Sequence, residues 1–243
     1  MLPQDLRVDS GVREKAKGLA IVVGAGSGLG VALLRRFQEG GYKAVGFVRS
    51  EVDSESNPEG CDIRQLDFTD AERAAAEMRM LMDEYGPPKI VVHNTAQLII
   101  NAFTETRLED YEETWRAMVF SAVVLAQRVL QAMACADGGA FLVSGAAASL
   151  RGGAKISAFS SVKFALCGLT QSLAREYQAR GVHVAHFILD GIIDSARSRV
   201  LHLLAPASMM KPEDIAENYW YIAHQAKSAW SHEIDLHPHL ENF

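Results

Sequence analysis

Residues 19–30 read LAIVVGAGSGLG, and this stretch decides the fold. Its first five residues, 19–23, are apolar and rich in β-branched side chains, which predicts a short buried strand. A glycine-rich turn follows at residues 24–30, and the stretch VALLRRFQE at residues 31–39 has the apolar spacing of a helix. A strand, a glycine turn and a helix in this order are typical of the first unit of a parallel βαβ chain.

The same alternation continues along the chain. Short apolar runs, which predict strands, lie at residues 44–48, 63–68, 90–94, 140–145 and 182–189. Longer amphipathic runs, which predict helices, lie at residues 71–86, 108–134 and 157–180. We therefore expect a single α/β domain over residues 1–243: a Rossmann-like, doubly wound parallel sheet with helices on both faces.

Composition narrows the class of protein. Of the 243 residues 49% are hydrophobic and 22% are charged, which is typical of a globular chain. Thirty acidic against 24 basic residues give a net charge of −6, so we expect no nucleic-acid partner. The three cysteines form no CxxC pair and no cluster with histidine, so we expect no disulfide and no metal site. No signal peptide or membrane-spanning run is recognised, and we expect a cytoplasmic protein.

The glycine turn is a candidate phosphate cradle. Glycines at positions 24, 28 and 30 let the backbone turn tightly and approach a diphosphate, whose charge then meets unpaired amides at the start of a helix. A plain tight turn is the alternative interpretation. The position between the first strand and the first helix favours the dinucleotide interpretation.

Two residues at the ends of the following strands bear on the identity of the cofactor. Arg49 follows the second strand, where an NAD-selective protein would place a carboxylate for the ribose diol. A guanidinium can instead hold a 2′-phosphate through two hydrogen bonds, so Arg49 predicts NADP(H) rather than NAD(H), unless it is simply a solvated arginine. Asp67 is placed to accept a hydrogen bond from the adenine amino group, although capping of a helix is an alternative.

With these motifs the sequence resembles the short-chain dehydrogenases/reductases over essentially its whole length. The resemblance rests on VGAGSGLG (23–30), LDFTD (66–70), VVHNTA (91–96), FSSVK (159–163), DGIIDS (190–195) and KPEDIA (211–216). It implies a seven-stranded sheet, a nicotinamide dinucleotide across the carboxyl ends of the strands, and a homodimer or homotetramer built through the two long helices. The cofactor-binding residues that it implies are Gly24, Ser27, Gly28, Leu29, Gly30, Arg49, Asp67, Phe68, Asn94, Ala96, Lys163, Gly191, Ile193 and Ser195.

The catalytic positions of the family are where this chain departs from the pattern. In that family a tyrosine donates a proton while hydride moves, a lysine supports it, a serine positions the substrate oxygen and an asparagine holds a relay water. Lys163 matches the lysine, whereas Phe159, Ala146 and Met118 stand at the other three positions. A benzene ring has no ionisable proton, so no change of environment makes Phe159 an acid. Lys163 is thus the one catalytic residue that we carry over.

Other groups could supply a proton. Asp190 is a candidate base beside the nicotinamide, or a charge that favours its oxidised form. Ser144 and Ser160 flank the same site, and a desolvated Lys163 could itself donate. After Gly191 the residues Val200, Leu201, Leu203, Leu204, Met209 and Met210 make an apolar stripe, which favours a helix face packed on the core over a pocket for an apolar substrate.

Two functions fit these observations. The first is an oxidoreductase that moves hydride between NADP(H) and a small, apolar carbonyl or activated alkene. The second is a catalytically inactive NADP(H)-binding sensor or assembly protein, for which the three apolar replacements argue. The only further partner expected is a small-molecule substrate, or none.

Overall fold

The structure is a computed structural model that describes residues 16–50, 61–202 and 204–240. All its strands join one seven-stranded sheet in the order β3-β2-β1-β4-β5-β6-β7, and every neighbouring pair is parallel. This confirms the predicted doubly wound α/β fold. The ends of the expected domain, residues 1–15 and 241–243, lie outside the described residues.

The strands are β1 (Leu19–Val23), β2 (Lys43–Val48), β3 (Asp62–Gln65), β4 (Ile90–His93), β5 (Gly139–Ser144), β6 (Val182–Leu189) and β7 (Glu233–Leu236). The α-helices are α1 (Leu29–Glu39), α2 (Ala71–Tyr85), α3 (Leu108–Trp115), α4 (Ser121–Cys135), α5 (Ser157–Tyr177), α6 (Ala196–Leu201) and α7 (Pro212–Ala223).

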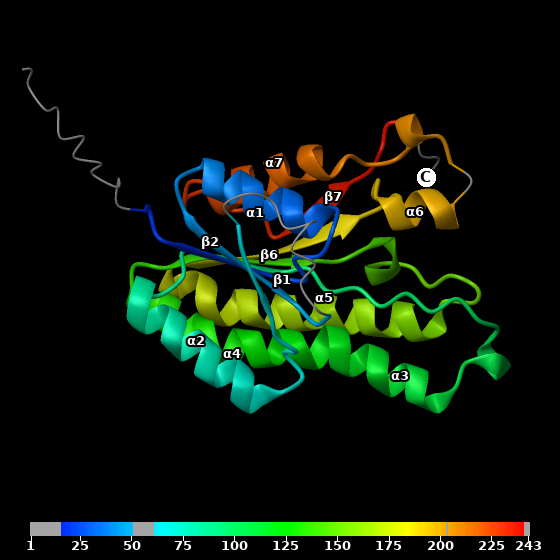
Figure 1. Ribbon diagram of the computed structural model, residues 1–243, viewed down its shortest axis with the longest axis horizontal. Coiled ribbons are helices and arrows are strands. Elements are labelled where there is room, and N and C mark those ends of the chain that lie inside the picture. Colours follow the sequence, from blue (N-terminus) through cyan, green and yellow to red (C-terminus); the bar gives the residue numbers. More distant parts are fainter. Residues whose placement is uncertain (1–15, 51–60, 203, 241–243) are drawn as a thin grey trace, which may run out of the picture.

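Helices cover both faces of the sheet. In Figure 1, α1 and α7 lie above the sheet, and α2, α4 and α5 lie below it. Successive residues of a strand point to opposite faces of the sheet, and each face carries one buried apolar cluster. Leu19, Ile21 and Val23 belong to the lower cluster, whereas Ala20 and Val22 belong to the upper one. This alternation follows from the period of two of a strand, and burial on both faces explains why these strands are apolar throughout.

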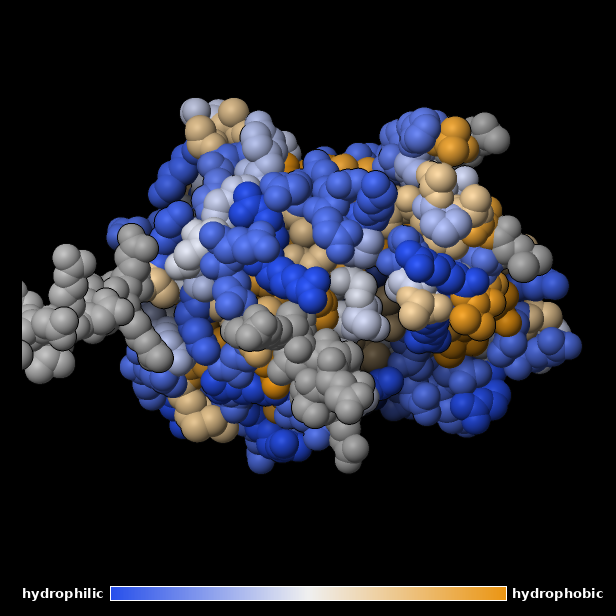
Figure 2. Space-filling view, turned by 45° about the horizontal axis from the view of Figure 1, so that its top comes forward, coloured by the Kyte–Doolittle hydropathy of each residue, from blue (hydrophilic) through white to orange (hydrophobic). Residues whose placement is uncertain are grey.

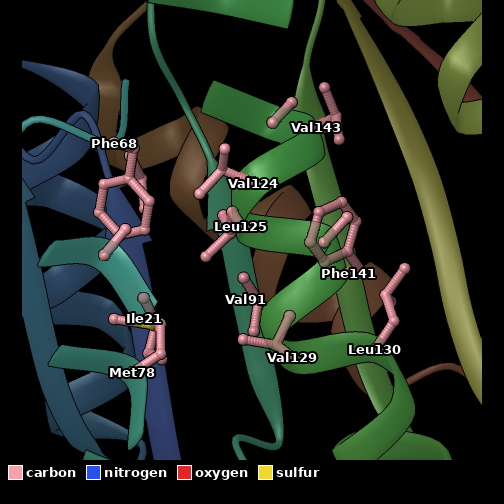
Figure 3. Packing of buried hydrophobic residues seen from close by; sticks show 14 of the residues in the cluster. Ile21, Phe68, Met78, Val91, Val124, Leu125, Val129, Leu130, Phe141 and Val143 are labelled. Atoms are coloured by element: carbon pink, nitrogen blue, oxygen red, sulfur yellow. The ribbon is translucent and has the colours of Figure 1, made fainter. Parts of the chain in front are cut away.

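The lower layer is a closely packed apolar core. Figure 3 shows Val124, Leu125 and Val129 of α4 packed against Val91 of β4 and Phe141 of β5. Because these residues are 4% exposed or less, they fix the helix against the sheet. The core thereby sets the positions of the loops that leave the carboxyl ends of β4 and β5.

The first long predicted helix is confirmed, with one irregularity. It consists of α3, a π-helical turn at Arg116–Phe120, and α4. The segment Leu108–Cys135 is long and apolar enough to cross a membrane, but 56% of its most apolar window is buried inside the protein. Such burial against a sheet is typical of a core helix. π-Helical turns are frequent at functional sites, and this one contains Met118.

The direction of winding reverses beside β1. The chain passes from β1 to β2 and β3 on one side and then returns to β4 on the other side. Doubly wound sheets bind their ligands in the crevice at this reversal, outside the carboxyl ends of the strands. The glycine turn after β1 and Asn94 after β4 both lie there.

Candidate cofactor cleft and reaction centre

A cleft of about 540 Å³ lies at this reversal. It is lined by the glycine turn, by the ends of β2 and β4, by the turn before α4, and by the segment after β6. The predicted cofactor residues that line it are Gly24, Ser27, Gly28, Leu29, Gly30, Arg49, Asp67, Phe68, Asn94, Ala96, Ile193 and Ser195. With the segment after β3 included, residues from six separate segments of the sequence thus meet at one surface.

The glycine turn approaches its neighbours too closely for side chains. Gly24 has a φ of +87°, and a Cβ on it would collide with the carbonyl oxygen of Asn94. A Cβ on Gly30 would collide with the backbone of Gly24 and Ala25. The turn is held from both sides, because Gly24 N donates to Phe47 O at 2.9 Å and Asn94 Nδ2 donates to Gly24 O at 3.1 Å. These contacts leave a cradle of backbone beside the start of α1, which suits a diphosphate.

Charged side chains at the strand ends remain available to a ligand. Arg49 lines the cleft, and its guanidinium has no ion pair or hydrogen bond within the described residues. Asp67 Oδ1 accepts a hydrogen bond from Thr69 N at 2.8 Å, which closes a local turn. The N-cap of α2 is Asp70, whose side chain accepts from Arg73 N, so Asp67 does not cap that helix.

Two predicted cofactor residues do not line this cleft. Lys163 is buried below it, and Gly191 is packed by the carboxyl-terminal segment: a Cβ on Gly191 would lie 2.6 Å from Pro238 Cδ and 3.0 Å from Met210 Sδ. The absence of a side chain at Gly191 therefore has a packing reason within this chain. Ser195 does line the cleft, but its hydroxyl accepts from Ser198 N at 3.1 Å and caps α6.

Sequence reasoning missed several polar residues of the cleft, notably Thr95, Gln97, Ser121 and Arg197. Arg197, like Arg49, has no partner within the part of the chain that the structure describes. The Oε1 atom of Gln97 is buried and accepts no hydrogen bond. None of these residues belongs to a local motif, although Thr95 and Gln97 follow the fourth strand directly and could have been found by that position.

The reaction centre that the resemblance predicts is apolar apart from Lys163. Met118 is fully buried, and its Sδ accepts from Gln97 N at 3.4 Å. Phe159 packs against the buried cluster that contains Met118, and its ring centroid lies 5.5 Å from Lys163 Nζ. Ala146 starts a short turn, and its own backbone N–H donates to Ser149 Oγ at 3.2 Å. None of these three side chains can donate or accept a proton.

Lys163 is 1% exposed, and its Nζ donates to Ser144 O at 2.8 Å. Burial disfavours its charged form and lowers its pKa to about 7. Two buried histidines share this region. Burial, with a smaller contribution from the nearby Lys163 charge, lowers the pKa of His93 to about 3 and that of His186 to about 4. Both imidazoles are therefore neutral at physiological pH.

The alternative proton donors have other roles here. Asp190 forms an ion pair with Arg151 at 2.6 Å, so its charge is already balanced. Ser144 Oγ lies 2.7 Å from the Tyr219 hydroxyl in a buried hydrogen bond. Ser160 is buried, and its Oγ has no partner in the described structure. Ser121 lines the cleft, and its hydroxyl donates to Ala117 O at 2.7 Å and lies 2.8 Å from His93 Nε2.

The apolar stripe after Gly191 divides into two parts. Met209 and Met210 are buried, as a face packed on the core requires. Val200 and Leu201, however, are 84% and 61% exposed, so the prediction that the stripe packs on the core is wrong for these residues. The reason is that α6 is only six residues long and projects from the domain after Ser195. Leu203 lies outside the described residues.

Figure 2 shows hydrophobic residues gathered at the end of the molecule at which α6 lies in Figure 1. The large apolar side chains exposed on the loops after β4, β5 and β6 are Leu98, Ile100, Phe103, Leu150, Val200, Leu201 and Leu204. Because parallel strands end at one edge of the sheet, these loops share the end that carries the cleft. The described residues contain no group of three metal-ligating side chains.

Comparison with known proteins agrees with this architecture. The family model described as short chain dehydrogenase matches residues 18–201. The chain belongs to the short-chain dehydrogenase family. This family binds NAD(P)(H), and the glycine cradle and the two arginines that line the cleft fit such a ligand.

Three proteins show how similar this short-chain dehydrogenase is to known sequences and structures. An uncharacterized oxidoreductase of Staphylococcus aureus (strain N315) is 25% identical over 227 residues, which are 90% of this chain and 96% of the relative. The 3-oxoacyl-[acyl-carrier-protein] reductase of Vibrio cholerae is 26% identical over 191 residues, covering 76% of this chain and 77% of its own. The crystal structure of a short-chain dehydrogenase from Rhodopseudomonas palustris superposes with a TM-score of 0.77 at 26% identity, covering 91% and 98% of the two chains.

Proposed function

We propose that this short-chain dehydrogenase is an NADP(H)-dependent oxidoreductase with an atypical reaction centre. It transfers hydride to or from a small, apolar carbonyl compound or activated alkene. The observation that carries the proposal is the combination of a glycine cradle with the Arg49 guanidinium, which has no partner among the described residues, in one cleft. Such a site suits a dinucleotide that carries an additional phosphate.

Different residues of the cleft bind different parts of the dinucleotide. The backbone amides of the glycine turn hold the diphosphate, and Arg197 adds a positive charge to the lining of the cleft. Arg49 holds the 2′-phosphate, and the free oxygen of Asp67 accepts from adenine. When bound, the nicotinamide supplies or takes up the hydride.

The substrate is proposed to be apolar because of the side chains at the reaction centre and around its opening. Phe159 and Ala146 have no polar atom in their side chains, and Met118 Sδ already accepts from Gln97 N. Exposed aliphatic side chains on the loops beside the cleft, among them Ile100 and Val200, add apolar surface that a substrate can cover.

A second candidate function is a catalytically inactive NADP(H)-binding sensor or assembly protein. The observation that favours it is the absence of an ionisable side chain at Phe159, Ala146 and Met118 together. Loss of a positioned acid alone slows proton transfer by roughly 10²- to 10⁴-fold.

One experiment separates the two functions. The purified chain is titrated with NADPH, and the oxidation of bound NADPH is then followed with a panel of aldehydes, ketones and enones. Turnover of any of these acceptors supports the oxidoreductase. Tight binding of NADPH without turnover across the panel supports the sensor, and absence of NADPH binding refutes both.

We also propose that the chain forms a homodimer or homotetramer through α4 and α5 and acts in the cytoplasm. Light scattering on the purified chain measures the oligomeric state, and a monomer at micromolar concentration would refute this assembly.

A further inference from the structure

A second cavity, of about 460 Å³, lies beside α7. It is lined by the start of α7, by the segment just before that helix, and by the end of β7 with the residues that follow it. It has no lining residue in common with the cofactor cleft. Its volume lies within the roughly 300–1,000 Å³ of small-molecule sites in proteins. Because α7 lies on the face of the sheet opposite α4 and α5 (Figure 1), the assembly proposed above does not use this face.

Part of the lining is apolar and held in place. Met209, Met210 and Ile215 line the cavity, and these residues are 4%, 8% and 2% exposed. Met210 N donates to Ile192 O at 2.9 Å, and Met210 O accepts from Asp194 N at 2.8 Å, which ties this part of the lining to the segment after β6. A preformed apolar lining favours a ligand with an apolar body.

Two oppositely charged side chains line the same cavity. Lys211 is the N-cap of α7, and Asp214 is the third residue of that helix. In the part of the chain that the structure describes, neither side chain forms an ion pair or a hydrogen bond, either with the other or with a third residue. Side chains at the N-cap and at the third position of a helix lie next to each other, as in a capping box. The cavity therefore offers a cation and an anion side by side.

These groups restrict the class of ligand. A carboxylic acid without an amine would leave the Asp214 carboxylate unmatched, and an amine without an acid would leave the Lys211 ammonium unmatched. A molecule that carries a carboxylate and an ammonium group on one carbon atom, together with an apolar body, matches both charges and the apolar lining. The imidazoles of His237 and His239, which also line the cavity, can donate or accept a hydrogen bond at either ligand group.

We propose that this cavity binds a free α-amino acid with an apolar side chain. Lys211 pairs with its carboxylate, Asp214 pairs with its ammonium group, and its side chain lies against the two methionines and Ile215. The binding is non-covalent and involves no nucleotide. The site is thus independent of the hydride transfer proposed above, and it gives the chain a small-molecule partner besides a cofactor and its acceptor.

Binding of leucine and of two analogues tests the match of charges. Ligand-observed NMR on the purified full chain measures dissociation constants for leucine, for 4-methylpentanoate, which lacks the ammonium group, and for 3-methylbutylamine, which lacks the carboxylate. We expect each analogue to bind about fivefold more weakly than leucine, because each loses one partly exposed charge pair. Equal affinity for leucine and either analogue, or no detectable binding of leucine at about 10 mM, would overturn the inference.

Two further amino acids test the arrangement of these groups. 6-Aminohexanoate is an isomer of leucine with its charges at opposite ends, and serine keeps the adjacent charges but lacks the apolar body. Each should bind at least about fivefold more weakly than leucine. Binding of 6-aminohexanoate as tight as that of leucine would show that adjacent charges are not recognised. Equally tight binding of serine would show that the apolar lining is not used, and either result would overturn the inference.

Substitutions assign the two charges separately. Lys211→Met should remove the preference for leucine over 3-methylbutylamine, and Asp214→Asn should remove the preference for leucine over 4-methylpentanoate. Lys227→Met and Glu213→Gln are the matched controls, because these exposed residues do not line the cavity, and both preferences should persist in them. A preference that stays unchanged in Lys211→Met or in Asp214→Asn would overturn the pairing assigned to that residue.

Saturating NADPH separates this site from the cofactor cleft. Because the two cavities share no lining residue, leucine should still bind when NADPH is present. Displacement of leucine by NADPH would place it in the cofactor cleft and overturn the inference. Binding of leucine by a chain that fails to bind NADPH would support the inference while refuting the proposed function.

Discussion

The cofactor cleft and the reaction centre lie at the same edge of the sheet, yet they differ in what they are made of. The cleft is built from backbone: a glycine turn fixed by Phe47 and Asn94. Two guanidinium groups line it, those of Arg49 and Arg197, and neither has a partner within residues 16–50, 61–202 and 204–240. The reaction centre depends on single side chains, and three of its four positions are apolar. The fold fixes the shape of the cleft, whereas individual side chains fix the chemistry of the reaction centre. Substitutions can therefore change the chemistry while the binding geometry is kept.

The largest expected effect comes from adding the missing polar groups. Phe159→Tyr combined with Ala146→Ser places a phenol and a hydroxyl beside Lys163. Because a positioned acid accelerates proton transfer by roughly 10²- to 10⁴-fold, we expect reduction of saturated ketones to rise by a factor in that range. The rate of NADPH oxidation with cyclohexanone measures it.

Phe164→Tyr is the matched control, since it adds the same hydroxyl to an exposed residue of the same helix, 47% exposed. It should leave ketone reduction unchanged. If the double variant gained no activity while binding NADPH normally, the interpretation of the reaction centre would be wrong.

A substitution in the cradle should affect the cofactor cleft strongly. At Gly24, where φ is +87°, alanine would collide with the Asn94 carbonyl, so we expect Gly24→Ala to weaken NADPH binding by about 100-fold or more and to lower stability. Gly26→Ala is the control for stability alone, because no atom of the protein lies within 4 Å of a Cβ at that position. Calorimetric titration and thermal unfolding of both variants measure the effects. Equal stability of the two variants would contradict the described turn.

Cofactor choice should depend on Arg49. Arg49→Asp replaces a cation by a carboxylate that repels a 2′-phosphate, so we expect NADPH affinity to fall by about 10- to 100-fold and NADH affinity much less. Arg199→Asp is a control at an arginine that pairs with Asp194 instead of lining the cleft. Dissociation constants for both nucleotides measure the difference. Equal losses for NADPH and NADH would refute the assignment of the 2′-phosphate.

The smallest expected effect concerns stability and its dependence on pH. The pKa of Lys163 is about 7 in the folded chain against an ordinary value of 10.5, so between these values the unfolded chain holds a proton that the folded chain has lost. Stability therefore rises with pH across this window, and the cost of the buried charge is fully present below about pH 7. Lys163→Met should remove this dependence and stabilise the cofactor-free protein by about 1–4 kcal/mol at pH 6.

Urea unfolding at pH 6 and pH 9 measures this change in the free energy of unfolding. Lys227→Met, at an exposed lysine, should leave both values unchanged. A wild-type protein whose stability does not rise between the two pH values would show that Lys163 is not desolvated.

The fold could be predicted because its signals are local. The glycine turn and the alternating apolar runs predict the elements of the sheet, since a strand and a helix each impose a period on the sequence. The exact ends of the strands were harder to predict. The third strand ends at Gln65 rather than at residue 68, because its pairing with β2 ends at Val48. The π-helical turn around Met118 carries no sequence signal that we recognise.

Parts of the site could not be predicted, because they depend on contacts between distant residues. The pair between Arg151 and Asp190 joins positions 39 residues apart and removes a candidate base. Arg197 enters the cleft from a short helix, and Pro238 packs on Gly191 from the end of the chain. Hydrophobic periodicity also gave a wrong prediction of burial for Val200. The reason is that apolar residues on a projecting helix have the same spacing as those on a helix packed against the core.

In the proposed function, nucleotide binding is intact while ordinary proton donation is absent. The fluorescence of NADPH bound to the wild-type protein, followed after the addition of a saturated ketone, tests this claim most directly. We predict that the signal of bound NADPH appears on mixing and then decays at least about 100-fold more slowly than in the Phe159→Tyr, Ala146→Ser variant. Failure of NADPH to bind, or rapid decay at equal rates in the two proteins, would contradict it.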